Sequence, residues 1–225
     1  MSNVVLIMGE SGTGKSTSIR TLNPSETFII NVIDKALPFK GFKSSYKNMS
    51  PDGLEGNVRV CDDAVLLAGK TIPFVIANRP DIKNIVIDDF QYIMGNEFMR
   101  RAKERGFDKF TEIAMHAWLV INTCMKASSN INFFILTHSE LGDNGRAKCK
   151  TIGKMLDEKI TIEGLFTIVL QSFVQDGKYR FLTQYDAQSI AKSPMGMFED
   201  KYIPNDLQYV VDKINAYFND EDIPQ

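Results

Sequence analysis

A glycine-rich segment near the start of the sequence has the residue types and spacing that bind a chain of phosphates. Residues 9–16 read GESGTGKS and match the P-loop pattern G-x-x-x-x-G-K-[ST]. The glycines allow backbone N–H groups to point at a phosphate, Lys15 can meet the β- and γ-phosphates, and the Ser16 hydroxyl is a hard oxygen ligand for Mg²⁺. We therefore predict a nucleoside triphosphate site formed by Gly9, Glu10, Ser11, Gly12, Thr13, Gly14, Lys15, Ser16 and Thr17.

The residues on either side of this motif fit the context that a P-loop requires. The apolar run 4–8 predicts a buried strand, and residues 15–22 are compatible with a helix that Asn23 and Pro24 end. A helix that begins near Gly14 would add the positive end of its dipole to the phosphate site. The alternative is an ordinary glycine-rich turn between a strand and a helix, which these flanking residues disfavour.

Two adjacent carboxylates follow a later apolar run. Residues 83–89 read KNIVIDD and predict a strand that ends at Asp88 and Asp89. Asp88 has the position of a Walker B carboxylate, which holds Mg²⁺ directly or through water beside a P-loop. Two interpretations of Asp89 stay open: it is the base or orienting group for an attacking water, or it caps the helix that begins at Phe90.

Polar side chains also follow the strand predicted at residues 131–137. Many P-loop ATPases with an additional strand place it between the P-loop strand and the Walker B strand, with a polar sensor at its tip, and Thr137 or His138 fits that role. Glu140 is a second candidate for the base, and Asp34 is a third. The candidate catalytic residues are thus Lys15, Asp89, His138 and Glu140.

The remaining patterns indicate an α/β fold. Apolar residues at helical spacing predict helices at 90–105, 110–128 and 205–218, and more weakly at 62–68. Further strands are predicted at 27–33, 58–61, 165–174 and 179–185, the last two joined by an Asp176-Gly177 turn, and loops at 35–52 and 141–152. Strands that alternate with helices and then form a hairpin predict one domain, residues 1–225, with a mostly parallel sheet and an added antiparallel hairpin.

Composition excludes several classes of protein. The chain has 225 residues, of which 44% are hydrophobic and 24% charged, and a formal net charge of −2, so it can bury a core but has no uniformly basic surface. Its three cysteines lack C-x-x-C spacing, which gives no zinc pattern and suits reduced thiols in a cytoplasmic chain. No segment approaches the roughly 18 to 20 apolar residues of a membrane span, so we expect no membrane partner.

Five segments together resemble a known family. They read GESGTGKST, NIVIDDFQYIM, FFILTHSE, KTIGKMLDEKITIEGLFTIVLQ and AKSPMGMFEDKYIPNDL. The set is similar to the phage nucleotide-binding proteins of the RecA-like P-loop ATPase group, which includes the Sak-type single-strand annealing ATPases. The resemblance implies a RecA-like core, ATP with Mg²⁺, assembly into a ring or filament, and work on single-stranded DNA in phage recombination or replication in the host cytoplasm. A phage single-strand binding protein is a candidate partner.

One departure from the family concerns the catalytic base. Many RecA-like ATPases carry a glutamate near the end of the second strand, where this sequence has Asp34 and Lys35. The base is therefore unassigned among the carboxylates named above, and slow hydrolysis is one expected consequence.

Two basic clusters are candidates for DNA binding. The first, after the sensor strand, consists of Arg146, Lys148 and Lys150. No acidic residue separates these three, and the resemblance makes their segment a mobile DNA-binding loop at a central axis, so DNA contact is favoured. The second consists of Arg100, Arg101, Lys103, Arg105 and Lys109, where the interleaved Glu104 favours a solvated surface.

Two further lysines have open roles. Lys154 and Lys192 could reach the γ-phosphate of a neighbouring subunit, contact DNA or face solvent.

Two rival functions share the P-loop. A nucleotide or small-molecule kinase needs an acceptor pocket and usually an arginine-rich lid, but between Thr137 and Tyr179 the sequence has one arginine, Arg146. A nucleotide-gated assembly factor would bind ATP with little turnover.

Overall fold

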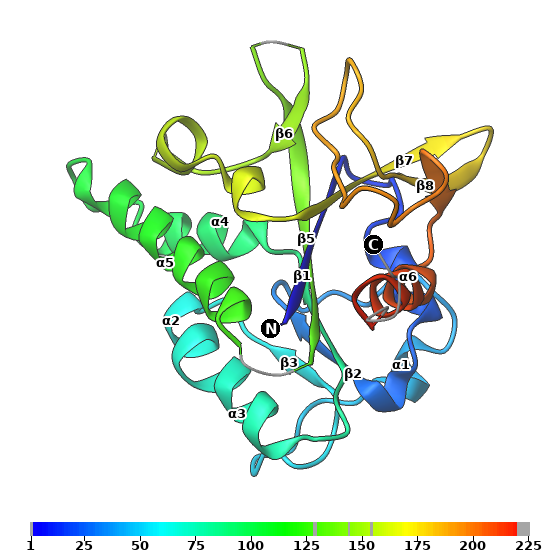
Figure 1. Ribbon diagram of the computed structural model, residues 1–225. Coiled ribbons are helices and arrows are strands. Elements are labelled where there is room, and N and C mark those ends of the chain that lie inside the picture. The colour runs from blue at the N-terminus through cyan, green and yellow to red at the C-terminus, as the bar shows by residue number, and fades with distance from the viewer. Residues whose placement is uncertain (1, 128–129, 144, 154, 220–225) are drawn as a thin grey trace.

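The computed structural model describes residues 2–127, 130–143, 145–153 and 155–219 (Figure 1). The described strands form one sheet in the order β3-β2-β4-β5-β1-β7-β8-β9, with β6 paired to β5 beside this path. Pairing is parallel from β3 through β7 and antiparallel for the β5–β6, β7–β8 and β8–β9 pairs. The predicted α/β fold with a mostly parallel sheet is confirmed.

The strand bounds agree with most of the predicted runs. The parallel strands are β1 (Asn3–Gly9), β2 (Thr27–Asn31), β3 (Val58–Val60), β4 (Asn84–Asp88), β5 (Asn132–Leu141) and β7 (Ile168–Gln175). The antiparallel strands are β6 (Ala147–Cys149), β8 (Lys178–Leu182) and β9 (Tyr202–Pro204). The predicted hairpin turn is present, because Asp176 and Gly177 both have positive φ, 50° and 70°.

The pairing of β6 with β5 corrects two predictions. The segment 141–152 is not all loop, and β5 continues to Leu141 instead of ending at residue 137. β5 is longer than predicted because β6 supplies hydrogen-bond partners for its backbone. The side chains within 141–152 do not alternate clearly enough to predict that pairing.

The helices are less regular than the sequence suggests. They are α1 (Phe42–Ser45), α2 (Ala64–Leu66), α3 (Ile72–Asn78), α4 (Gln91–Arg100), α5 (Asp108–Met125) and α6 (Leu207–Asn219). The helix predicted at 62–68 is wrong in extent, since a π-helical turn at Leu67–Thr71 joins α2 to α3. Residue 128, the predicted end of the helix after α4, lies outside the described residues. No described helix has the length and apolar character needed to cross a membrane.

Side chains of β1 alternate between two hydrophobic cores. Leu6 and Met8 belong to the core that α2 to α5 cover, whereas Val5 and Ile7 belong to the core beneath α6. Figure 1 shows these two groups of helices on opposite faces of the sheet. Burial on both faces explains why β1 reads as a continuous apolar run.

A ladder of asparagine amides fixes the register of the central strands. The Asn3 side-chain amide donates to Asn132 Oδ1 (3.0 Å), and the Asn132 amide donates to Asn84 Oδ1 (3.2 Å). With this register Gly9 lies opposite His138, and Asn31 lies opposite Asp88. The carboxyl ends of β1, β2, β4 and β5 therefore carry their polar residues to the same edge of the sheet, where ligands of open α/β sheets bind.

Candidate functional site

The turn after β1 requires glycine at several positions. Gly12 and Gly14 have φ of +82° and +98°, which residues with a Cβ rarely adopt. At Gly9 a Cβ would lie 2.2 Å from Ser172 Oγ and 2.8 Å from the Ser172 carbonyl oxygen. The glycines predicted to shape a phosphate loop are thus needed for its conformation.

The prediction for the helix after this turn is wrong in both type and length. Ser16–Thr21 forms a six-residue 3₁₀ helix, not the longer helix expected from residues 15–22. A segment this short adds little dipole to the site. Positive charge beside the turn therefore comes mainly from Lys15.

The Lys15 ammonium is folded back onto the loop that carries it. Its Nζ donates to the Gly9 and Glu10 carbonyl oxygens, each at 2.9 Å, and the residue is 5% exposed. Burial lowers the pKa of Lys15, although the charges of Asp89 and Asp88 act in the opposite direction. Among the described residues its hydrogen-bond partners are these two carbonyl oxygens, so this buried cation is well placed to attract an anion.

Ser16 and Asp88 meet as a P-loop and Walker B pair would. Ser16 Oγ donates to Asp88 Oδ1 at 3.0 Å, and Asp88 is fully buried. Burial raises the pKa of Asp88, and its Oδ2 is a buried oxygen with no hydrogen-bond partner in the structure. Within the described residues no cluster of three His, Cys, Asp or Glu side chains could hold a metal ion, but Mg²⁺ commonly takes one or two protein oxygens and completes its shell with phosphate and water.

Asp89 is held by cationic and imidazole groups. His138 Nε2 lies 2.8 Å from Asp89 Oδ2, and Lys35 Nζ lies 3.9 Å from the same oxygen. Asp89 is 1% exposed, and its Oδ1 is buried with no hydrogen-bond partner among the described residues. The alternative that Asp89 caps the following helix is wrong, because the N-cap residue of α4 is Phe90 and the helix has no side-chain cap.

A cavity of about 300 Å³ brings these groups together. It is lined by Ser11, Gly12, Gly14, Lys15, Ser16, Thr17, Lys35, Ala36, Pro38, Asp89, His138 and Tyr179. Gly9, Glu10, Thr13 and Asp88 are not part of this lining, although Asp88 is joined to it by the hydrogen bond from Ser16. The volume is at the lower end of the range for small-molecule sites.

The other candidate bases lie elsewhere. Glu140 does not line the cavity; its Oε1 lies 3.8 Å from Lys148 Nζ on the β5–β6 hairpin. Asp34 is exposed, with a positive φ of 52°, and also lies outside the lining. Thr137, the alternative sensor, is 2% exposed, and its Oγ1 has no hydrogen-bond partner in the structure.

Sequence reasoning missed part of the cavity wall. The Tyr179 ring would lie 2.7 Å from a Cβ at Gly14, and Asn205 Nδ2 donates to the Gly14 carbonyl oxygen at 3.2 Å. Ser172 Oγ lies 2.7 Å from Thr13 Oγ1. These contacts come from the β7–β8 hairpin and the chain beyond it, and no local pattern in the sequence links them to the glycine-rich turn.

The basic residues predicted to bind DNA have local partners. The Arg146 guanidinium lies 5.0 Å from the centre of the Tyr185 ring, and Lys148 lies beside Glu140 as described above. Lys150 is exposed. The prediction of one mobile loop is wrong, because this segment includes β6, but all three residues stay on one hairpin arm.

Both arginines at the start of the second basic cluster form ion pairs. Arg101 pairs with Glu97, Glu104 and Glu112, and Arg100 pairs with Asp62. These ion pairs agree with the prediction that favoured a solvated surface over DNA contact for this cluster. Lys154 lies outside the described residues, and the backbone of Lys192 pairs with that of Val169.

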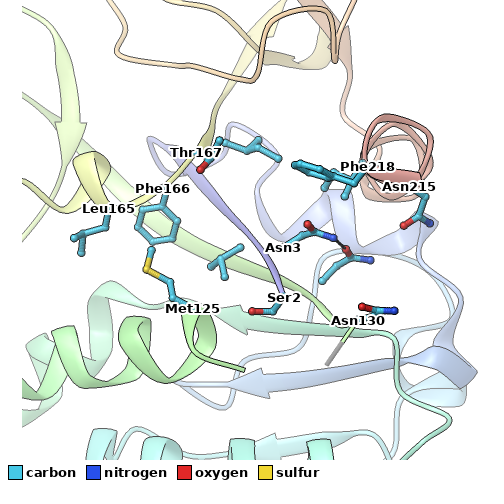
Figure 2. A pocket seen from close by; sticks show the side chains of 13 residues that line it. Ser2, Asn3, Met125, Asn130, Leu165, Phe166, Thr167, Asn215 and Phe218 are labelled. Atoms are coloured by element: carbon cyan, nitrogen blue, oxygen red, sulfur yellow. Dashed lines mark hydrogen bonds between the residues drawn. The ribbon is translucent and has the colours of Figure 1, made fainter. Parts of the chain in front are cut away.

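A larger cavity, about 630 Å³, lies at the amino ends of the parallel strands (Figure 2). Its described lining includes Ser2, Asn3, Asn130, Thr167 and Asn215 among apolar side chains such as Phe166 and Phe218, and none of the described lining residues is charged. It therefore lacks groups that hold a phosphate chain, and the smaller cavity is the better site for the predicted chemistry.

Comparison with known proteins adds no assignment: no protein-family model and no curated protein matches this sequence.

Asp88→Asn is expected to stabilise the nucleotide-free protein and, at the predicted magnesium site, to weaken the predicted Mg²⁺-dependent binding of ATP. Because folding raises the pKa of Asp88 above its usual value, stability is lost as pH rises from that usual value through the folded pKa, so the loss is present at neutral pH. Asparagine carries no charge and can still accept from Ser16, so the gain should be about 1 kcal/mol. Thermal unfolding at pH 7 with and without Mg-ATP measures both effects; a lower melting temperature without nucleotide would contradict this account.

Proposed function

We propose that this chain is a RecA-like P-loop ATPase that binds ATP with Mg²⁺ and acts on single-stranded DNA in phage recombination or replication. The observation that carries the proposal is the 3.0 Å contact from Ser16 Oγ to Asp88 Oδ1 beside the cavity that Lys15 lines. A hydroxyl, a carboxylate and an ammonium around a glycine-rich turn are the groups that hold Mg²⁺ and a triphosphate.

The order of strands supports the finer assignment of fold. β5 pairs with β1 on one side and with β4 on the other, so one strand separates the glycine-rich turn from Asp88. An added strand in that place is what the resemblance to RecA-like ATPases implies.

The donor groups fit a magnesium ion. Ser16 and Asp88 would hold it, since the Oδ2 atom of Asp88 is buried and lacks a partner. When bound, Mg²⁺ neutralises negative charge on the phosphate oxygens. Lys15 would exchange its two carbonyl partners for phosphate oxygens, which offer its buried ammonium a full opposite charge.

Hydrolysis then needs a base for water, and Asp89 is favoured. Its Oδ2 is held by His138 and Lys35, whereas Oδ1 has no partner and can accept the proton of a water that attacks the γ-phosphorus. The bond between the γ-phosphorus and the leaving oxygen of ADP breaks as the new bond to water forms. His138 orients Asp89, and Glu140 and Asp34 are disfavoured because they lie outside the cavity lining.

One contact favours a second candidate function. Lys35, whose Nζ lies 3.9 Å from Asp89 Oδ2, stands near the place where many RecA-like ATPases carry a catalytic glutamate. A nucleotide-gated assembly factor that binds ATP with little turnover is therefore the alternative.

The DNA part of the proposal rests on the β5–β6 hairpin. It carries Arg146, Lys148 and Lys150 on one arm, and cations on an extended arm can follow a phosphate backbone. The proposal includes assembly into a ring or filament in the cytoplasm, where Lys192 remains a candidate cation for a neighbouring subunit and a phage single-strand binding protein a candidate partner.

One assay separates these functions. Thin-layer chromatography of labelled ATP, with and without single-stranded DNA and with candidate nucleoside acceptors, distinguishes three outcomes. Release of phosphate that DNA stimulates supports the ATPase, transfer to an acceptor supports a kinase, and binding without product supports the assembly factor.

Lys15→Ala is expected to weaken ATP binding by at least about tenfold, because it removes a charged donor to the phosphates. Calorimetric titration with Mg-ATP measures the loss, and Lys70→Ala, at an exposed lysine outside the cavity lining, is the control. Unchanged affinity in a folded Lys15→Ala protein would remove the P-loop assignment.

Asp89→Asn is expected to keep ATP binding and to lower turnover by about 10²-fold or more, since the amide cannot accept the proton. Single-turnover hydrolysis of labelled ATP measures the rate, and Glu140→Gln serves as the comparison outside the cavity. Normal hydrolysis by Asp89→Asn would exclude this residue as the base.

Replacing Arg146, Lys148 and Lys150 by glutamine is expected to weaken binding of single-stranded DNA and to leave ATP binding intact. Each lost phosphate contact lowers the salt slope by roughly 0.7, so the slope should fall by about two. Glutamine avoids placing a new negative charge beside Glu140. The comparison is Lys103→Gln with Arg105→Gln, two exposed residues of the other cluster; a loss in that variant alone would move the DNA site there.

A further inference from the structure

The backbone of Lys35 is held in place by a buried side chain. Asn31, which is 2% exposed, donates from Nδ2 to the Lys35 carbonyl oxygen (2.9 Å), and its Oδ1 accepts from the Lys35 N–H (3.3 Å). The preceding residue, Asp34, has the uncommon φ of 52°. Both polar groups of the Lys35 backbone are thus fixed to the end of β2, and the base of its side chain has a defined position.

The Lys35 side chain lies in the cavity that contains the glycine-rich turn. It lines this cavity together with Lys15, Asp89 and His138, and its Nζ lies 3.9 Å from Asp89 Oδ2. Its side chain is 37% exposed, so it is not locked against one partner. An ammonium has three donors and can keep an acidic neighbour while it meets another anion.

The position of Lys35 within the cavity indicates which phosphate it would meet. Asp89 follows Asp88, the partner of Ser16, and that pair would hold a magnesium ion, which would neutralise charge on the phosphates. The groups around Asp89 would therefore lie near the terminal phosphate, whereas Tyr179 lies against Gly14 at another part of the wall. Among the described residues that line the cavity, the cations are Lys15 and Lys35.

We propose that Lys35 contacts the terminal phosphoryl group of a nucleoside triphosphate bound in the same chain, and that it makes the site favour triphosphate over diphosphate. This inference rests on the proposed ATP site. It assigns to a residue of the chain itself the role that a neighbouring subunit's cation would otherwise have, so triphosphate recognition would not require assembly. The diphosphate lacks the group that Lys35 meets, so removal of the charge should affect the two nucleotides unequally.

The test compares binding of the β,γ-imido analogue of ATP with binding of ADP, both with Mg²⁺, by calorimetric titration. Lys35→Ala and the neutral Lys35→Gln should each weaken binding of the triphosphate by about tenfold, because a charged donor to phosphate is lost. They should weaken binding of ADP by less than about twofold. Lys35→Arg should keep most of the preference. Lys40→Ala, at a nearby exposed lysine outside the cavity lining, is the matched control. Equal weakening of both nucleotides, or no change in either, in a folded variant would overturn the inference.

A mixing experiment tests whether the contact is made within one chain. Lys35→Ala retains the glycine-rich turn, and Lys15→Ala retains Lys35. If Lys35 acts in its own chain, an equimolar mixture should bind no more triphosphate than the sum of the two variants alone. Recovered binding in the mixture would show that Lys35 reaches a neighbour's nucleotide and would overturn the inference.

These outcomes are distinct from failure of the proposed function. Wild-type protein that binds neither nucleotide better than Lys15→Ala would remove the ATP site itself, and this inference with it. Wild-type binding that depends on Lys15 but not on Lys35 would remove this inference alone.

Discussion

The hydrogen bond between Ser16 and Asp88 depends on the alignment of three strands. Ser16 follows β1 and Asp88 ends β4, yet β5 lies between these strands. The two side chains meet in a register that places Ile135 of β5 opposite both Leu6 of β1 and Ile87 of β4. The asparagine ladder at the opposite edge holds that register, because a shift of one residue would break both amide contacts and turn each strand's side chains to the other face.

The edge of the sheet that carries Ser16 and Asp88 also holds buried charged groups that folding alone would not favour. Lys15, Asp88 and Asp89 are each at most 5% exposed, and the pKa shifts of Lys15 and Asp88 both run toward the neutral form because burial disfavours their charges. One oxygen of each carboxylate has no partner. Buried charges with unmet hydrogen-bonding capacity are common at functional sites, since a ligand supplies the missing contacts. The core elsewhere is apolar on both faces of the sheet, which provides the stability that such a site reduces.

The sequence was most informative where a short pattern determines local structure. The glycine-rich turn, the apolar strands before it and before Asp88, and the Asp176-Gly177 turn could all be predicted, because each depends on neighbouring residues or on burial of a whole strand. The prediction failed where contacts between residues that are distant in the sequence determine the local structure. The 3₁₀ form of Ser16–Thr21 accompanies contacts from Thr21 to α6, and β6 exists because β5 extends to pair with it. Tyr179 and Lys35 line the cavity from two other strands' ends. Of these two, only Lys35 was marked in the sequence, because it stands where the resemblance leads us to expect a glutamate.

Strand β5 connects the candidate nucleotide site to the candidate DNA arm. His138 belongs to this strand, and its side chain contacts Asp89. The His138 carbonyl oxygen accepts from the Lys150 N–H at 2.8 Å. Further along the hairpin, Glu140 pairs with Lys148, so the basic arm and the residue that orients Asp89 share one continuous ladder. In the proposed function, DNA that draws Lys148 or Lys150 toward its phosphates would therefore shift the backbone that positions His138. Under that proposal, stimulation of hydrolysis by DNA would need no separate relay, because the basic arm and His138 share these backbone hydrogen bonds.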